Sequence, residues 1–245
     1  MKSRPLTVWA GSTVILVVGV MLWALASRRV FVIPTPVATL AALGSDLGDQ
    51  GYQANLVATA QGAAVAFAIS VGIGVGLGLP LGLSRRLRQV LLGLLVALNG
   101  LPKIVLYPLL LLLFGMGLPS KIAMGAMFGA FPVMLNLAAG LTDLPPIYAR
   151  LGRSLRANGL QMLLHIYLPA TLGPFLTGVR LAFSLSLVGV VLAEILATRF
   201  GLGRVIEQSY SLGRYPEMMG TILLLLSASF IGSVAIWSVE RRVSR

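Results

Sequence analysis

Long apolar runs separated by short polar or basic segments form the main pattern of this chain. A transmembrane helix needs about 20 consecutive, mainly apolar residues, because the helix rises about 1.5 Å per residue across the hydrocarbon layer. Runs of this length recur along nearly the whole sequence. They predict helices at about residues 6–26, 54–83, 90–116, 121–141, 172–197 and 217–239. The pattern therefore predicts an all-α, polytopic membrane protein with about six transmembrane helices.

The connections between these helices differ in character. Residues 28–53 are a polar connection, residues 83–89 are a short basic turn, and residues 117–120 are a tight turn. Pro102 and Pro108 interrupt the third helix, and such breaks are tolerated where the backbone is buried in protein or lines a cavity. The second helix is longer than one crossing requires, so we expect it to be tilted or to extend beyond the membrane.

The first apolar run has two interpretations. A basic start followed by an apolar run and Ala24-Leu25-Ala26 resembles a cleavable signal peptide. The run covers residues 6–26, however, which is longer than the roughly 7–15 apolar residues of a signal peptide. We therefore interpret residues 1–31 as an N-terminal transmembrane helix and residues 32–245 as the core of the protein.

Composition supports a membrane protein and excludes several other classes. Only 11% of the residues are charged and 57% are hydrophobic, whereas a soluble domain carries roughly 25% charged residues. The net charge of +12 does not indicate nucleic acid binding, because the basic residues lie mostly between the apolar runs, where they determine topology. Cysteine is absent, which excludes disulfides, thiol catalysis and thiolate metal sites.

The distribution of Lys and Arg beside the apolar runs predicts an orientation. Cytoplasmic loops carry an excess of these residues, and the larger group falls on the side of the N-terminus. This group is Lys2, Arg4, Arg85, Arg86, Arg88, Arg150, Arg153, Arg156, Arg241, Arg242 and Arg245. The smaller group, placed outside, is Arg28, Arg29, Lys121, Arg199, Arg204 and Arg214. We therefore expect both termini and the loop before the fifth helix to be cytoplasmic.

That loop, residues 143–169, has the pattern of two short helices. In the first helix Ile147, Leu151 and Leu155 lie on one side while the arginines lie on the other. Thr142 or Asp143 is expected to cap its start, and Asn158-Gly159 is expected to provide a left-handed exit. A second helix at 160–167 precedes Pro169, which is expected to break the chain before the fifth span. Periodicity alone fits either a basic hairpin on anionic lipid or a docking site for another protein.

Few residues offer chemistry inside the membrane. Lys103 and Glu194 are the ionisable residues expected in the membrane zone, where an unpaired charge costs roughly 3 kcal/mol. Lys103 either contributes to an anion path or lies at the interface with its ammonium group extended to water. Packing or gating roles for Glu194 are as plausible as substrate contact. The stripe Gly72, Gly74, Gly76, Gly78 and Gly82 allows close helix contact, most simply within one chain.

The sequence also bears on two other classes of function. The sequence has few residues that could serve an intramembrane enzyme. Its seven acidic residues and one histidine, His165, form no metal or catalytic motif. The chain also has no G-x-x-x-x-G-K-[ST] sequence for nucleotide hydrolysis. We therefore predict no catalytic residues, no metal site and no cofactor in this chain. An ATP-independent carrier or channel remains an alternative.

The segment "RLGRSLRANGLQMLLHIYLP" resembles the loop that defines transmembrane subunits of binding-protein-dependent ABC importers. The family pattern is E-A-A, three residues, G, and then an apolar residue, any residue, and L-P. Aligned on Leu168-Pro169, the E-A-A falls on Arg150-Leu151-Gly152 and the glycine falls on Arg156, so neither signature residue is kept. Other similar stretches are "IPTPVATLAAL", "GIGVGLGLPLGLSRRLRQVL", "LPKIVLYPLLLLLFGMG" and "GLGRVI". The set is similar to the nitrate, taurine and alkanesulfonate group of these permeases.

This resemblance implies a type I ABC importer permease in the bacterial inner membrane. Two copies would form the path for a small anion such as a sulfonate, taurine or nitrate, which a binding protein delivers. A separate ATPase subunit would bind ATP and Mg²⁺ and work the loop as a coupling helix. The coupling residues implied are Arg150, Leu151, Gly152, Arg153, Leu155, Arg156, Ala157, Gly159, Leu168 and Pro169. Lys103 and Glu194 are the candidates for the translocation path.

Overall fold

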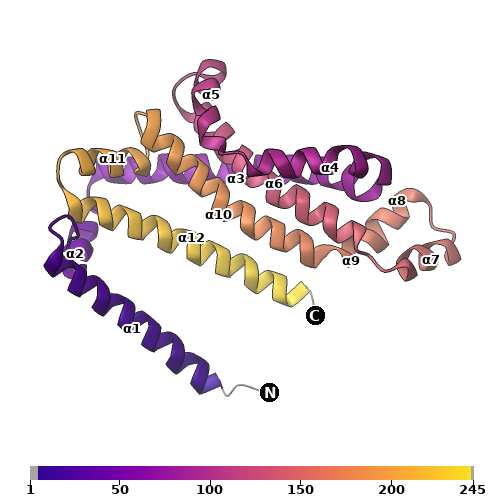
Figure 1. Ribbon diagram of the computed structural model, residues 1–245, viewed down its shortest axis with the longest axis horizontal. Helices are drawn as coiled ribbons and strands as arrows, with labels where there is room; N and C mark the ends of the chain where they lie inside the picture. Colours follow the sequence, from indigo (N-terminus) through magenta and orange to yellow (C-terminus); the bar gives the residue numbers. More distant parts are fainter. Residues whose placement is uncertain (1–4, 244–245) are drawn as a thin grey trace.

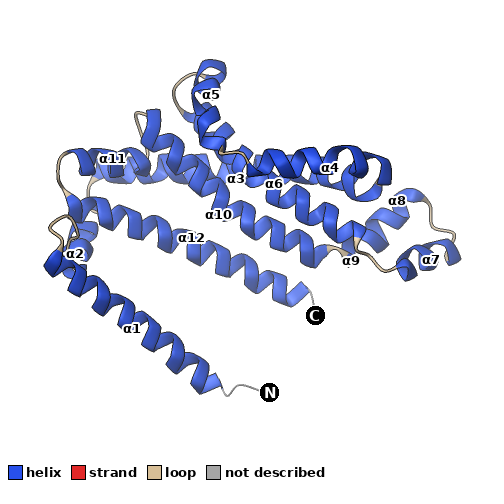
Figure 2. Ribbon diagram, viewed as in Figure 1, coloured by secondary structure: helices blue, strands red, loops and turns tan. Residues whose placement is uncertain are grey.

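The computed structural model describes residues 5–243, with side chains described at 13–15 and 17–242. Within this range all regular structure is helical (Figure 2). The elements are α1 (Pro5–Arg29), α2 (Pro36–Asp46), α3 (Gln50–Leu83), α4 (Arg85–Gly100), the 3₁₀ turn η1 (Lys103–Leu106), α5 (Tyr107–Phe114), α6 (Leu118–Thr142), α7 (Pro146–Ser154), α8 (Gly159–Met162), the π turn η2 (Leu163–Tyr167), α9 (Leu168–Ala170), α10 (Leu172–Ala197), α11 (Leu202–Ser211) and α12 (Tyr215–Val243).

Four of these helices, α3, α6, α10 and α12, are long and apolar enough to cross a membrane. The pair formed by α4 and the segment Lys103–Phe114 passes the same test together, but it is bent by 88°. The predicted first span coincides with α1, which is 25 residues long and includes side chains outside the described set. The all-α polytopic prediction is confirmed, and the predicted bounds 172–197 for the fifth helix agree with α10.

The core of the fold is the close packing of α3, α6 and α10. Glycines make this possible, because a Cβ atom added at Gly82 would lie 2.6 Å from Leu141 of α6, and one at Gly189 of α10 would lie 2.9 Å from the backbone of Gly125. Ser70 of α3 lies where the three helices meet, and its hydroxyl is 2.9 Å from the Ser186 hydroxyl of α10. Small residues thus allow backbone approach, as is typical of helix packing in membranes.

The glycine stripe of α3 divides between two faces. Gly74, Gly78 and Gly82 face α6, where an added Cβ would collide with Val133, Met134 or Leu141. Gly72 and Gly76 have open space around them. The prediction of contact within one chain is therefore confirmed for three of the five glycines.

The third predicted span is broken at Pro102, as predicted, but not at Pro108. Pro102 lacks an N–H and Leu101 before it is extended, with ψ at 143°, so the helix cannot continue through this point. Pro108, by contrast, lies in the first turn of α5 and interrupts nothing. The basic turn predicted at 83–89 is wrong, because the break is confined to Ser84, whose side chain accepts a hydrogen bond from Leu87 N and starts α4.

Two helices were missed in the sequence. The polar connection at 28–53 contains α2, which Thr35 caps through a hydrogen bond from Ala38 N. The loop after α10 contains α11, which packs against α3, α10 and α12. Both helices are short, at 11 and 10 residues, so neither has an apolar run long enough to reveal it.

The molecule is elongated, with different elements at its two ends (Figure 1). The connection α7–α9 lies at one end, and α2 and α11 lie at the other. The C-terminal helix α12 runs beside α10, and Arg180 Nε of α10 lies 3.8 Å from Glu240 Oε2 of α12. Helix α1 diverges from the rest and stays linked near α2, where Trp23 Nε1 donates to Pro34 O at 3.0 Å.

Candidate functional site

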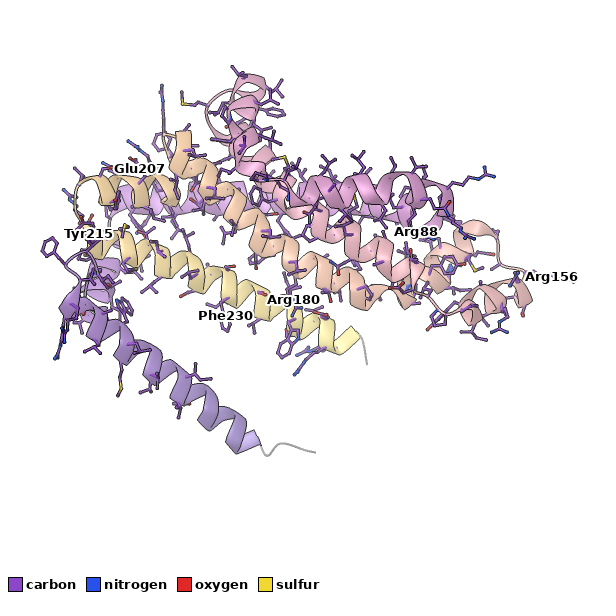
Figure 3. All side chains as sticks on the ribbon, in the orientation of Figure 1. Arg88, Arg156, Arg180, Glu207, Tyr215 and Phe230 are labelled. Carbon is purple, nitrogen blue, oxygen red and sulfur yellow. The ribbon has the colours of Figure 1, made fainter. Side chains whose placement is uncertain are left out.

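The predicted coupling segment, residues 143–169, leaves the bundle between the end of α6 and the start of α10. Figure 3 shows Arg156 at the tip of this end, far from Glu207 and Tyr215 at the other end. The side chains of Arg150, Arg153 and Arg156 are all exposed. Leu151 and Leu155 are exposed as well, and Leu155 reaches 67%. The segment therefore has an apolar strip beside a basic strip, and both strips are exposed.

The first helix of the segment, α7, ends in a different way from the one predicted. Arg156 has a φ of 52°, and it is the one residue other than glycine with positive φ among the described residues. Arg156 N donates to Arg153 O at 3.1 Å and Ala157 N donates to Gly152 O at 2.9 Å. These two bonds form a Schellman motif, in which the left-handed residue is usually glycine. The family's glycine falls on this residue, so the structure explains the glycine, and the exit predicted at Asn158-Gly159 is wrong.

Arginine in a left-handed conformation carries a cost that glycine does not. We therefore expect Arg156→Gly to stabilise the end of α7 by roughly 0.5–1 kcal/mol. Hydrogen exchange at the Ala157 amide should slow in this variant, because that amide closes the motif. Arg150→Gly, in the middle of the same helix, is the matched control and should accelerate exchange. Faster exchange in Arg156→Gly would contradict the assignment.

The helix caps of the segment and the role of Pro169 differ from the predictions. Thr142 and Asp143 do not cap α7, which begins after Pro145 without a side-chain cap. Asn158 instead caps α8 in a capping box with Gln161, with hydrogen bonds of 2.8 and 2.9 Å. Gly159 starts α8 in open space, and Leu168 and Pro169 form the first turn of α9. Pro169 therefore does not break the chain, which turns into α10 at Thr171.

Gly152 fixes how the two halves of the segment pack. It is buried, and a Cβ atom there would collide with the Met162 side chain. At the base of the segment, Arg88 of α4 donates to Gly82 O at 3.0 Å and to Thr142 Oγ1 at 2.9 Å. Figure 3 places Arg88 at the same end of the molecule as Arg156. The segment is thus a compact unit that follows α6 in the chain, and Arg88 ties the last turn of α3 to the last residue of α6, where the segment begins.

A buried ion pair lies at the opposite end of the bundle. Lys121 Nζ of α6 is 2.7 Å from Glu194 Oε1 of α10, and the two residues are 3% and 0% exposed. Lys121 Nζ also donates to Ala58 O at 3.0 Å. Lys121 was predicted to begin the fourth span as one of the outside charges that determine topology. The helix instead begins at Leu118, one turn earlier, and Lys121 is buried in the core.

Glu194 also holds the start of α11 in place. Its carboxylate accepts hydrogen bonds from the Thr59 hydroxyl at 2.8 Å and from Gly203 N at 3.0 Å. The Thr59 oxygen accepts from Leu202 N at 2.7 Å, and Asn55 Oδ1 accepts from Gly201 N at 2.7 Å. Sequence reasoning missed both residues of α3. Their polar side chains recur four residues apart on an apolar helix, which is the signal that could have revealed them.

Lys103, the other predicted path residue, lies apart from Glu194. Its ammonium group donates to Asn99 O at 2.8 Å and to Asn99 Oδ1 at 3.1 Å. It also lies 4.9 Å from the centre of the Phe131 ring, a favourable distance for a cation–π contact. The group is therefore satisfied next to the break in the third span. A role in the path stays a prediction for both Lys103 and Glu194.

Two adjoining cavities follow the face of α3 that the core leaves open. The larger, which we call the apolar groove, has a volume of about 690 Å³, with Val65, Ile69, Ile73 and Leu77 of α3 along one side. The smaller, which we call the mouth cavity, has a volume of about 350 Å³. The mouth cavity is lined by Ala58, Gln61, Leu118, Lys121, Thr198 and Arg199, among others. Leu118 lines both, so they form one continuous surface from the end with the ion pair toward the middle of the bundle.

Known proteins of similar sequence are transport permeases. Over 159 residues the chain is 33% identical to a probable ABC transporter permease protein of Haemophilus influenzae, covering 64% of this chain and 65% of that protein. It is 27% identical to a formylaminopyrimidine transport permease of Halalkalibacterium halodurans, covering 90% and 89%. It is 25% identical to a taurine transport permease of Escherichia coli, covering 99% and 90%.

A solved structure supports the same fold. The chain superimposes on a chain of the inward-facing MetNI methionine ABC transporter with a TM-score of 0.68 at 18% identity, covering 80% of this chain and all of that one. Residues 68–245 match the family described as the inner membrane component of binding-protein-dependent transport systems. This match covers most of the chain, including the broken third span, the coupling segment and the residues Lys121 and Glu194. The chain belongs to this family, the permease components of ABC importers.

Proposed function

We propose that this chain forms one half of the translocation path of an ATP-driven importer for a small organic or inorganic anion. The observation that carries the proposal is the uncovered coupling segment at one end of the two core helices α6 and α10. A partner that moves this segment would move both helices, because the segment is compact and is continuous in the chain with α6 at one end and α10 at the other. Anion transport is supported by the resemblance to nitrate, taurine and sulfonate permeases.

The partner at the segment is proposed to be a separate ATPase subunit, which binds ATP and Mg²⁺. An apolar strip beside three exposed arginines suits a groove with an apolar floor and acidic groups at its rim. ATP chemistry in the partner agrees with the lack of a nucleotide-binding motif in this sequence. On the other side of the membrane, an extracytoplasmic binding protein would deliver the anion.

A second copy of this chain is proposed to cover the apolar groove. The groove is open along the face of α3, where Gly72 and Gly76 also leave the helix backbone accessible. Small residues on an open face permit close approach of another helix. Two grooves facing each other would enclose a path between the copies, and rocking of the two copies would open it to either side.

The proposal is tested by reconstituting the chain in liposomes with its ATPase subunit and binding protein. Uptake of the anion held by that binding protein should require ATP on the side of the ATPase and should stop when the ATPase is omitted. A chain that moves the anion equally well alone would instead be a carrier or channel. That result would exclude the importer mechanism.

The orientation can be tested separately, because the chain has no cysteine. We expect Leu155→Cys, in the coupling segment, to react with a membrane-impermeant maleimide only from the cytoplasmic side. Tyr210→Cys in α11 should react only from outside. Both positions are well exposed, at 67% and 62%. The opposite pattern of labelling would place the coupling segment outside and would reject the arrangement.

A further inference from the structure

The mouth cavity contains donor groups that the fold itself does not use. Arg199 and Gln61 line it, and neither side chain has a hydrogen bond or ion pair with another described residue. Both are exposed. Arg199 lies in the connection between α10 and α11, and Gln61 lies on α3, so the two donors reach the cavity from different elements.

The charge around the cavity is positive. Lys121 lines it, whereas its partner Glu194 does not. The carboxylate of Glu194 is fully buried and accepts hydrogen bonds from Lys121, Thr59 and Gly203 on the side of α11. Lys121 Nζ is bonded to Glu194 Oε1 and to Ala58 O, so the ion pair is neutral as a whole. Arg199 adds a positive charge, and the lining contains no acidic residue.

The start of α6 adds to this field. Gly117, which lines the cavity, precedes α6 and has no side chain to cap the helix. The N–H groups in the first turn of a helix lack partners within the helix, and they carry the positive end of its dipole. Pro119 has no N–H and Lys121 N donates to Gly117 O, so the first turn offers only the N–H groups of Leu118 and Ser120. An arginine and an amide beside this helix start are donors suited to an anion.

We propose that the mouth cavity binds a single small oxoanion, such as nitrate or the sulfonate group of an organic solute, through Arg199 and Gln61. The volume of about 350 Å³ admits a group of this size together with water. The guanidinium fork matches two oxygens of a planar or tetrahedral anion. This inference rests on the proposed function. In the importer, the mouth cavity would be the first place where a delivered anion contacts the permease, before it reaches the apolar groove.

The test uses the full chain in nanodiscs of phosphatidylcholine, with trifluoromethanesulfonate as the probe and its ¹⁹F line width as the signal. We expect saturable broadening that nitrate and methanesulfonate reverse. Arg199→Gln should weaken binding roughly tenfold, as expected for the loss of one charge-assisted hydrogen bond, and Gln61→Leu should weaken it less. Arg204→Gln is the matched control, because this arginine lies on α11 outside the lining and pairs with Glu207. It should bind as the unaltered chain does.

Two outcomes would overturn the site. One is broadening that does not saturate, and the other is equal binding in Arg199→Gln, Arg204→Gln and the unaltered chain. An anionic lipid headgroup presents phosphate oxygens without the choline cation of phosphatidylcholine, so a second series contains phosphatidylglycerol. Displacement of the probe by this lipid but not by nitrate would assign the cavity to lipid headgroups and reject the solute. Uptake driven by ATP is measured separately, so a permease that transports without binding the probe rejects the site alone.

Discussion

Glu194→Gln is expected to cost about 3–5 kcal/mol of folding free energy, the range typical of removing one member of a buried ion pair. Lys121 would keep its charge in a site that is 3% exposed and would lose the carboxylate 2.7 Å away. The glutamine keeps the shape of the side chain, so the loss would come from the charge. The measurement is the unfolding midpoint and free energy of the purified protein in mixed micelles, together with the yield of monodisperse protein.

The control for this experiment is a double substitution. Lys121→Met in the Glu194→Gln background removes the uncompensated charge, and the double variant should therefore be more stable than Glu194→Gln alone. Arg204→Gln, at an exposed pair on α11, should change stability by less than about 1 kcal/mol. A Glu194→Gln protein as stable as the unaltered chain would show that the pair carries no such energy.

The pair also has a consequence for how α11 is held. Glu194 accepts from Gly203 N, and a Cβ atom at Gly201 would collide with the Glu194 carboxylate. Gly201 has a φ of 130°, a conformation that other residues rarely adopt. The carboxylate thus joins α3, α6, α10 and α11 at one point. Any rearrangement of this end during transport has to keep these Glu194 contacts together or break them.

Arg150→Glu is expected to uncouple transport from ATP hydrolysis. In the complete importer we expect ATP hydrolysis to continue while uptake falls roughly tenfold or more, because reversing a charge at a docking surface places like charges together at a cost of several kcal/mol. Arg150 is exposed on α7, so the substitution should leave the fold of the isolated chain intact. Uptake and phosphate release are measured on the same liposomes.

Arg86→Glu provides the matched control for this substitution. It makes the same change of charge on an exposed side chain of α4, outside the coupling segment. Uptake should remain near that of the unaltered chain, and Arg150→Lys should retain most of it. Unchanged uptake in Arg150→Glu would reject the idea that acidic groups of the ATPase face this arginine.

The predicted site residues show where reasoning from the sequence stopped. Glu194 was predicted to be an ionisable residue of the membrane zone, and it is fully buried in α10. Its partner Lys121 was counted among the outside charges at the start of the fourth span. Lys121 follows a tight turn, and a difference of one helical turn in where α6 begins decides whether it is at the surface or in the core. The two residues are 73 positions apart, and nothing in either segment indicates their distance in space.

By itself, the sequence determined the class of protein and the approximate positions of the long apolar helices. These features follow from the length of apolar runs and from the backbone chemistry of proline, both of which act over a few residues. Only the tertiary structure decided which glycines face α6, that Lys121 pairs with Glu194, and that Arg156 adopts the left-handed turn in which the family has glycine. These three contacts and conformations depend on how each helix is rotated about its axis and on which residues begin and end it. Packing sets both, since a shift of one residue turns a side chain by about 100° from one neighbour to another.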